Sequence, residues 1–284
     1  MNSFSIVTIV YNDVAHIKET MDSVVNQSYR NIEYILVDGR SSDGTKEEIY
    51  NYISSCATIT QEDIEKDRFY LEATHKLYPT LTFKFLSKKD KGIYDAMNKG
   101  IALATKEWIN FMNCGDRFYN LDVLQKIAEN KINGCNVIYG DTEVFYTDQN
   151  LGIIKVAPSN IQESLKKFGV NLIHQSMFFK TQIHKNLPYN TQNYKIASDY
   201  DLIYRFFHEG HSFQALPLIV SIFHTGGSSD IYGILRTNES FRILKQYNPN
   251  ICQTFAYYLF ALCKKITKKY LPSKFLKKMI TLQK

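Results

Sequence analysis

Carboxylate side chains follow four predicted strands of this chain, each just beyond the residue where the strand ends. Short apolar strands that alternate with helical patterns indicate a parallel sheet covered on both faces. The carboxyl ends of parallel strands meet at one sheet edge, where ligands bind, so these acids are expected to lie together. The strands and their acids are Phe4–Val10 with Asp13, Ile32–Val37 with Asp38, Leu81–Leu86 with Asp90, and Trp108–Met112 with Asp116.

Acids at a sheet edge suit the binding of a nucleotide with the help of a metal ion. One carboxylate can accept hydrogen bonds from a base or a ribose. Another can hold Mg²⁺ or Mn²⁺ against a diphosphate, because these hard cations take oxygen ligands. The metal then neutralises charge on a departing nucleoside diphosphate. Each acid alone also fits an ordinary turn, since Asp, Asn and Gly are common turn formers.

Two other phosphate-binding patterns are excluded. The glycine-rich GxGxxG pattern of dinucleotide-binding proteins is missing after the first strand. Residues 39–46 read GRSSDGTK, which has the glycine spacing of a P-loop but the wrong final pair. This loop also contains Asp43, whose charge would repel a phosphate.

A second constellation lies at Ile196–Leu202, at the start of a helix predicted over residues 198–208. Asp199 falls in the first turn, and Ser198 is the expected cap. An acid in this position fits a general base that takes the proton of an attacking hydroxyl. It also fits an acid that stabilises a helix N-terminus through the helix macrodipole alone. Both interpretations stay open on these residues.

The periodicity predicts an α/β protein whose first half is more regular than its second. Residues 55–81 have mixed charge and no clear period, and we interpret them as an insertion. After the polar turn Asp38–Thr45, either Ser42 or Asp43 is expected to cap a helix. Helices are also predicted over 14–27 and 93–104, short strands over 136–139, 142–146 and 152–156, and further helices near 160–168, 198–208 and 232–246.

Charge is distributed unevenly along the chain. Nine of its 34 basic residues and none of its 28 acidic residues lie within 245–284, so the preceding 244 residues carry a net charge of −3. A mildly acidic body argues against nucleic-acid binding. The basic, aromatic tail suits an amphipathic segment on an anionic membrane surface. A terminal helix packed on the body with solvated lysines is the alternative. One helical face would carry Lys264, Lys265, Lys268 and Lys269, and Pro272 would end that helix.

No segment approaches the roughly 20 apolar residues that a membrane-spanning helix needs. The first residues, MNSFSIVTIVYND, show no basic region and no cleavage site of a secretion signal. Five scattered cysteines indicate reduced thiols. We therefore expect a cytoplasmic protein, peripheral on the inner face of the cytoplasmic membrane.

Several segments of the chain together resemble family 2 glycosyltransferases with the GT-A fold, most of all bacterial enzymes that build cell-surface polysaccharides. The resemblance covers most of residues 3–230. Two of its segments, in order and at the right spacing, are very specific: VDGRSSDGT and DKGIYDAMNKGI. The others are SIVTIVYN, SVVNQSY, WINFMNCGD and ASDYDL.

The resemblance implies a Rossmann-like, mostly parallel sheet with helices on both faces, a smaller mixed acceptor-side portion and a helical tail. It implies a catalytic domain over 1–244, with a nucleotide-binding half over 1–116 and an acceptor half over 117–244, and a tail over 245–284. Inverting transfer of a hexose or N-acetylhexosamine is expected, from a UDP-sugar to a lipid-linked or saccharide acceptor, with Mn²⁺ or Mg²⁺ as cofactor.

The family's roles can be assigned residue by residue. Asp199 matches the catalytic base, and Asp116, with His224, matches metal ligands. His174 and Gln175 match a segment near the acceptor. The implied donor residues are Val10, Tyr11, Asn12, Asp38, Ser41, Asp90, Lys91, Gly92, Asp95, Asn98, Asn113 and Gly115.

One departure from the family pattern bears on activity. The metal motif reads Asn113-Cys114-Gly115-Asp116, so a single carboxylate stands where the family has more. A catalytically weak or inactive protein that binds sugar nucleotides is therefore one alternative, because a fold does not establish an activity. A nucleotidyltransferase is the other, although the first strand lacks the glycine- and arginine-rich triphosphate loop that such an enzyme needs.

Overall fold

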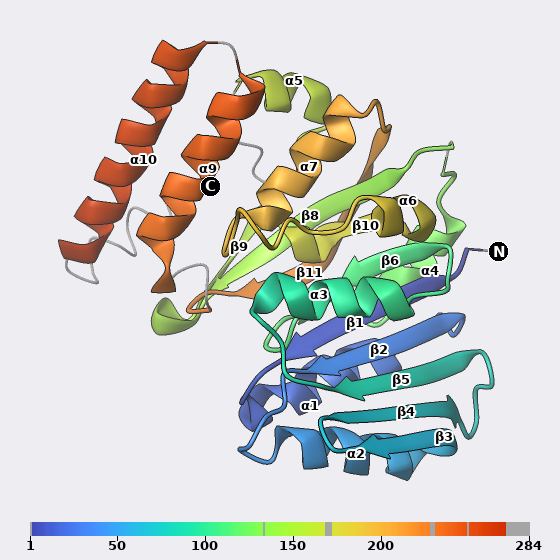
Figure 1. Ribbon diagram of the computed structural model, residues 1–284. Coiled ribbons are helices and arrows are strands. Elements are labelled where there is room, and N and C mark those ends of the chain that lie inside the picture. The colour runs from blue at the N-terminus through green and yellow to red at the C-terminus, as the bar shows by residue number, and fades with distance from the viewer. Residues whose placement is uncertain (1, 133, 168–171, 228–230, 249, 271–284) are drawn as a thin grey trace.

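One mixed sheet of eleven strands runs through the molecule (Figure 1). The computed structural model describes residues 2–132, 134–167, 172–227, 231–248 and 250–270. The strands are β1 (Phe4–Val10), β2 (Ile32–Asp38), β3 (Ala57–Glu65), β4 (Arg68–His75), β5 (Leu81–Ser87), β6 (Trp108–Phe111), β7 (Arg117–Phe118), β8 (Val137–Tyr146), β9 (Leu151–Lys155), β10 (Met177–Lys180) and β11 (Phe213–His224). Their order is β3-β4-β5-β2-β1-β6-β10-β8-β11-β7, and β9 pairs with β8 outside this path.

Helices cover both faces of the sheet. On one face α1 and α2 pack against β1, β2 and β5, and on the other α3 packs against β1 and β2 (Figure 1). The helices are α1 (Val14–Val25), α2 (Thr45–Cys56), α3 (Ile93–Leu103), α4 (Val123–Glu129), α5 (Ile161–Lys167), α6 (Thr181–Asn186), α7 (Ser198–His208), α9 (Gly233–Tyr247) and α10 (Ile251–Tyr270), with short 3₁₀ turns η1 (Thr147–Gln149) and η2 (His174–Ser176).

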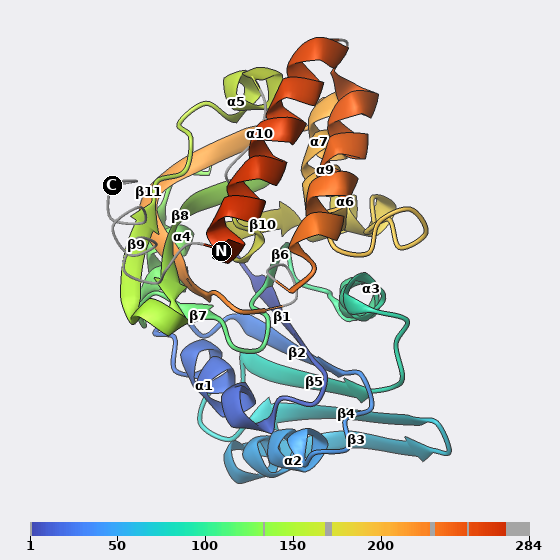
Figure 2. The same ribbon diagram turned by 90° about the vertical axis from the view of Figure 1, so that its left-hand side faces the viewer.

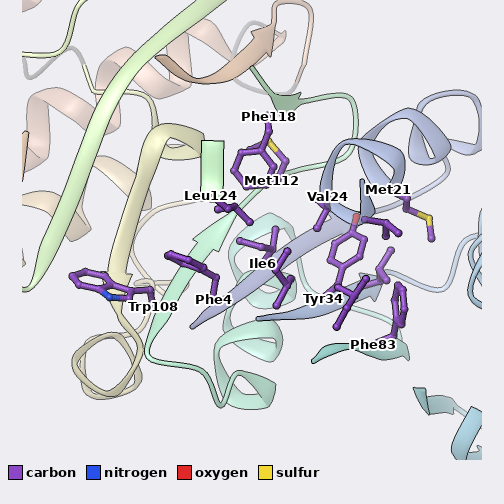
Figure 3. Packing of buried hydrophobic residues seen from close by; sticks show 14 of the residues in the cluster. Phe4, Ile6, Met21, Val24, Tyr34, Phe83, Trp108, Met112, Phe118 and Leu124 are labelled. Carbon is purple, nitrogen blue, oxygen red and sulfur yellow. The ribbon is translucent and has the colours of Figure 1, made fainter. Parts of the chain in front are cut away.

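The four central strands β5, β2, β1 and β6 are parallel, which confirms the predicted α/β class. All seven residues of β2 are buried, because helices cover both of its faces, and its sequence is accordingly almost continuously apolar. Figure 3 shows Tyr34 of β2 beside Phe83 of β5, with Met21 and Val24 of α1 above them. This packing fixes the strand ends that carry the predicted acids.

The segment interpreted as an insertion, for which no strand was predicted, forms an antiparallel hairpin at the edge of the sheet. Strands β3 and β4 pair from Ala57 with His75 to Glu65 with Arg68, and β4 pairs in turn with β5. The outermost strand, β3, exposes most of its side chains, many of them charged. A charged edge strand resists pairing with other molecules, and it also removes the hydrophobic period that sequence analysis relies on.

The second half of the sheet differs from the prediction at Gly140. Residues 136–139 and 142–146 were expected to be separate strands, but β8 is continuous through this glycine. A Cβ at Gly140 would lie 2.6 Å from the carbonyl oxygen of Leu218 on β11. The glycine therefore marks a close approach of two strands rather than a turn. The predicted strand over 152–156 is confirmed as β9, shifted by one residue.

Three predicted helices of the second half are confirmed as α5, α7 and α9. The last of these packs beside α10, where the Tyr258 hydroxyl donates to Asn238 Oδ1 at 3.0 Å (Figure 2). No helix in the described part of the chain has the length and apolar character needed to cross a membrane. The expected helix end at Pro272 lies outside the described residues. Sequence analysis missed β7, β10, β11, α4 and α6.

The packing of α3 on β1 yields a prediction of stability. A Cβ at Gly100 would meet Val7 Cγ1 at 2.5 Å. At a solvent-facing helical position Gly→Ala stabilises by about 1 kcal/mol, but here the methyl group overfills a core, which costs about 1–3 kcal/mol. We expect Gly100→Ala to lower the midpoint of urea unfolding. Ala102→Gly, at an exposed position of the same helix, measures helix propensity alone. A stabilised Gly100→Ala would contradict this packing.

Candidate active site

The loop after β2 is organised around Asp38, whose carboxylate is completely buried. Its oxygens accept the backbone N–H groups of Arg40 and Ser41 at 3.1–3.2 Å and the Ser87 hydroxyl at 2.6 Å. Arg40 has a φ of 69°, in the left-handed region, and the hydrogen bond from its N–H to Asp38 helps to hold this turn. Asp38 thus supports the loop of the predicted donor site, and its contact with a base or ribose remains a prediction.

Two predicted donor residues, Tyr11 after β1 and Asp90 after β5, meet at Gly39 after β2. A Cβ at this position would lie 2.5 Å from Asp90 Oδ2 and 3.1 Å from the Tyr11 ring. Any residue other than glycine at this position would force the loop or one of the two side chains to move. Asp90 is partly buried, which raises the pKa of its carboxyl above the usual value. Tyr11 is 65% exposed, so an aromatic face stands open beside the carboxylate.

Hydrogen bonds join the loops after β1 and β2. The N–H of Asn12 donates to Ser41 Oγ at 2.7 Å, and the N–H of Ser42 donates to Asn12 Oδ1 at 2.8 Å. Asp43 accepts the N–H groups of Val14, the first residue of α1, and Thr45, the first residue of α2. The residue that caps α2 by its backbone position is Gly44. The expected cap is therefore corrected, and Asp43 connects two helix starts instead.

Two predicted donor residues on α3 make contacts that support the fold. Asn98 donates to the carbonyl oxygen of Tyr189 at 3.0 Å and accepts its N–H at 2.9 Å. Asp95 accepts the N–H of Lys91 at 3.0 Å and pairs with Lys99. Of the remaining predicted donor residues, Val10 is buried, Lys91 and Gly92 are exposed, and Gly115 binds Thr20 through its N–H.

Asp116 lies buried where the two halves of the sheet meet. Its Oδ2 accepts Gln175 Nε2 at 2.6 Å, and its Oδ1 accepts the backbone N–H of His224 at 3.0 Å. Burial raises the pKa of this carboxyl to about 7, although both hydrogen bonds lower it. The structure thus brings together three residues that the sequence singled out, from the ends of β6 and β11 and from η2.

The surroundings of Asp116 fit a divalent cation that is held in part by its substrate. Asn113 Oδ1 and His224 Nδ1 are buried without a hydrogen-bond partner, and both are possible metal ligands. Among the described residues no cluster of three or more His, Cys, Asp or Glu side chains is arranged to hold a metal. An ion here would therefore need oxygen atoms from a diphosphate and from water. The Sγ atom of Cys114 contacts a different carboxylate, lying 3.5 Å from Asp13 Oδ2.

Asp199 lies in the first turn of α7, beside the hydroxyl of Tyr94. That hydroxyl is 2.9 Å from Asp199 Oδ1 and 2.8 Å from the carbonyl oxygen of Ile196, so its proton is shared between them. The cap of α7 is Ala197 by backbone position, and the hydroxyl of Ser198 is buried without a partner. The expectation that Ser198 caps the helix was therefore wrong.

His174 and Tyr189 complete the surroundings of Asp199. The His174 ring stacks on Phe111, and its Nε2 is hydrogen-bonded to the Tyr189 hydroxyl. Burial lowers the pKa of His174 to about 4, against the opposing effect of the Asp199 charge, so the imidazole is neutral at pH 7. Sequence analysis missed both tyrosines, although Tyr94 lies inside the segment DKGIYDAMNKGI, which was a sufficient signal.

Adjacent residues connect the two carboxylates of the site. Gln175 binds Asp116, while the preceding residue, His174, is hydrogen-bonded to Tyr189. The Tyr189 ring stacks on Tyr94, whose hydroxyl binds Asp199. One 3₁₀ turn therefore spans from the buried acid at the end of β6 to the acid at the start of α7. The site combines the surroundings of Asp116, which fit a metal ion and a diphosphate, with a second carboxylate, Asp199, from the other half of the protein.

Comparison with known proteins identifies relatives of this architecture. The model of the family described as glycosyl transferase family 2 matches residues 5–193. A PGL/p-HBAD biosynthesis glycosyltransferase of Mycobacterium bovis is 27% identical over 209 residues, which cover 72% of this chain and 69% of that protein.

Solved structures confirm the fold. A mannosyltransferase of Pyrobaculum calidifontis in complex with GDP-Man and Mn²⁺ has a TM-score of 0.62 at 15% identity, over 99% of this chain and 79% of that chain. S. aureus TarS 1-349 in complex with UDP-GlcNAc has a TM-score of 0.55 at 14% identity, over 89% and 69%. Their likeness to this chain confirms the predicted GT-A fold.

The raised pKa of Asp116 predicts how stability depends on pH in the metal-free protein. The carboxyl has a pKa near 3.9 in an unfolded chain and about 7 in the folded one. Its contribution to stability is present below pH ~4 and is lost as the pH rises through 7. Between pH 5 and pH 8 the free energy of unfolding of the wild type should fall by about 2.5 kcal/mol relative to that of Asp116→Asn.

Urea unfolding in the presence of EDTA measures this difference. Asp63→Asn, on the edge strand β3, is the matched control and should follow the wild type at both pH values. A constant difference between the wild type and Asp116→Asn would contradict the raised pKa.

Proposed function

The chain belongs to glycosyl transferase family 2, and from this premise we propose that it moves a sugar from a nucleotide-sugar donor to a hydroxyl group of an acceptor. The observation that carries the proposal is the pair of carboxylates Asp116 and Asp199, which bind Gln175 and Tyr94 respectively. His174, next to Gln175, binds Tyr189, which stacks on Tyr94. The first suits the diphosphate of a donor. The second suits the removal of a proton from an acceptor.

The donor is proposed to be a UDP-sugar carrying a hexose or an N-acetylhexosamine. Related folds bind UDP-GlcNAc in one case and GDP-Man in another, so both bases belong in the test. The nucleotide would lie along the loops that carry Asn12, Asp38 and Asp90, with Tyr11 as an aromatic surface. Loops tied together by hydrogen bonds are a rigid support for a base and a ribose.

The proposed reaction is a single in-line displacement with inversion. Asp199 takes the proton of the acceptor hydroxyl on one side of the sugar, and the nucleoside diphosphate leaves on the other. The transition state has oxocarbenium character, as in glycoside hydrolysis. Tyr94 holds Asp199 in place through its hydroxyl. His174, which is neutral at pH 7, adds no positive charge that would compete for the carboxylate.

A divalent cation, Mn²⁺ or Mg²⁺, is proposed to assist the departure of the diphosphate. Asp116 would hold it, with Asn113 and His224 as further ligands. The bound ion would supply positive charge that stabilises the leaving group. The chain itself keeps Asp116 in place through Gln175 and the backbone of His224. Metal binding should require loss of the proton from Asp116.

The acceptor is proposed to be lipid-linked or a saccharide, in the synthesis of a bacterial surface polysaccharide or glycolipid. The support is the name of the mycobacterial relative, which acts in PGL/p-HBAD biosynthesis. A protein that only binds sugar nucleotides is the alternative that the reduced metal motif keeps open. A nucleotidyltransferase is less well supported, because the family match is to glycosyl transferases.

Replacement of Asp199 is the test of this function. UDP- and GDP-sugars are offered with Mn²⁺ or Mg²⁺, with and without a lipid-linked acceptor, and released nucleoside diphosphate is measured. One donor should be turned over, and EDTA should abolish its turnover. Asp199→Asn should reduce kcat by about 10²–10⁴-fold while donor affinity, measured by calorimetry, is retained. Asp63→Asn should behave as the wild type. Normal turnover in a folded Asp199→Asn protein would remove Asp199 from the role of base.

The tail over 245–284 is proposed to attach the protein to the inner face of the cytoplasmic membrane, while 1–244 act as the catalytic domain. Residues 252–263 of α10 contain no charged residue. Several large apolar side chains of this stretch are exposed to solvent, among them Leu259 at 44% and Phe260 at 68% exposure. On α9, Ile234 is 58% exposed. Apolar surface followed by a lysine-rich segment suits an anionic lipid surface. Helix α9 itself runs across the proposed boundary at residue 244.

Vesicle binding tests the attachment. We expect the protein to sediment with vesicles that contain anionic phosphatidylglycerol, less with pure phosphatidylcholine, and less at high salt. Leu259→Ser should weaken binding about 10- to 100-fold, because the burial of a leucine is worth about 1.5–3 kcal/mol. Leu77→Ser is the matched control, because Leu77 is an exposed leucine outside the tail. Equal binding of both variants, or indifference to lipid charge, would contradict the proposal.

A further inference from the structure

Glu239 of α9 binds the backbone immediately before α7. Its carboxylate is buried, with 2% of the residue exposed. The N–H of Lys195 lies 3.0 Å from Oε1, and the N–H groups of Ile196 and Ala197 lie 2.9 Å and 3.0 Å from Oε2. A buried carboxylate is tolerated where such donors meet its charge. One side chain therefore holds three consecutive peptide groups.

This contact lies just before the start of α7 and takes up the N–H of Ala197, the residue at the cap position. Ala197, the capping residue by position, makes no side-chain hydrogen bond to the helix start, and the hydroxyl of Ser198 has no partner. The start of a helix presents unpaired N–H groups and a partial positive charge, which favour an anion. Arg242 contributes little to Glu239, since its guanidinium is 3.9 Å away and its side chain 58% exposed. The main partner of the carboxylate is thus the backbone.

Ile196 is held from both sides by this arrangement. Its N–H binds Glu239, and its carbonyl oxygen lies 2.8 Å from the Tyr94 hydroxyl, which also contacts Asp199 Oδ1. Asp199 follows Ile196 by three residues and lies in the first helical turn. The direction of the Asp199 side chain is therefore determined by α3 through Tyr94 and by α9 through Glu239.

We propose that Glu239 is a positioning residue for the reaction: it acts through the backbone of residues 195–197 to keep the carboxylate of Asp199 aimed at the acceptor hydroxyl. This inference rests on the proposed role of Asp199 as general base. Glu239 lies outside the residues that the family model matches, 5–193. Its assignment comes from the geometry of the buried carboxylate alone.

A shift of about 1 Å in a reacting group can cost about 10²-fold in rate, which sets the size of the expected effect. Glu239→Gln keeps the shape of the side chain but replaces one acceptor oxygen by an NH₂ group that faces N–H donors. We expect kcat to fall by roughly 10- to 100-fold. The KM for the donor should stay unchanged, because the residues proposed to bind the nucleotide lie on other loops. Glu239→Asp, which keeps the charge, should retain more activity than Glu239→Gln.

The deciding measurement is a double-mutant cycle of Glu239→Gln and Asp199→Asn, with Ser240→Ala as a control on the same helix. Turnover, donor KM and backbone hydrogen exchange over residues 195–199 are measured for each variant. If Glu239 acts through Asp199, the double variant is no slower than Asp199→Asn alone. Exchange over residues 195–197 should be faster in Glu239→Gln and unchanged in Ser240→Ala.

Three results would overturn the inference. Turnover of Glu239→Gln within twofold of the wild type would show that Asp199 needs no such support. Losses that multiply in the double variant would show that Glu239 acts independently of Asp199. Normal turnover of Asp199→Asn alone would refute the base itself, and this single variant distinguishes failure of the proposed function from failure of the positioning role.

Discussion

The buried carboxylate of Asp116 is the interaction on which the rest of the site depends. It accepts hydrogen bonds from Gln175 and from the backbone of His224, which follow it by 59 and 108 residues. A charge in this position is costly unless it is paired, and burial accordingly raises the pKa of the carboxyl to about 7. The parallel half of the sheet and the mixed half are thus held together at the point where a metal and a diphosphate would add positive and negative charge.

The edge of the sheet was predictable from the sequence because its strands are buried on both faces. Continuous apolar runs such as β2 give a strong signal, and the topology of parallel strands then brings Asp13, Asp38, Asp90 and Asp116 to one edge. The start of a predicted helix pointed to Asp199, and the resemblance to a known family added Gln175 and His224, which no local pattern singles out. These residues come together only in the tertiary structure, and a set of family motifs in the right order can predict such contacts.

The rest could not be read from local patterns, for reasons visible in particular residues. Strand β3 is an exposed, charged edge and carries no hydrophobic period. Strand β11 contains Pro217 beside a shift of register with β8, and a proline within a run argues against a strand. Gly140 resembled a turn but marks a close contact of two strands. Glu239 looked like one more polar residue of an amphipathic helix, because its partners are backbone groups more than 40 residues away.

Helix α9 has two faces with different physical tasks. Its inner face carries Glu239, whose buried charge is met by peptide groups before α7, while its outer face exposes apolar side chains such as Ile234. The hydrogen bonds of a buried carboxylate are directional and are lost when the groups shift. Apolar contact with a surface is non-directional, so it persists when the helix slides or rotates. The Glu239 contact therefore fixes the position of α9 against the start of α7 more strictly than the exposed apolar face can. Helix α9 also contacts α7 through Tyr247, whose ring stacks on Tyr204 and His208. The hydrogen bonds of Glu239 differ from these contacts because they end on the backbone three residues or fewer before the first turn of α7, the turn that carries Asp199.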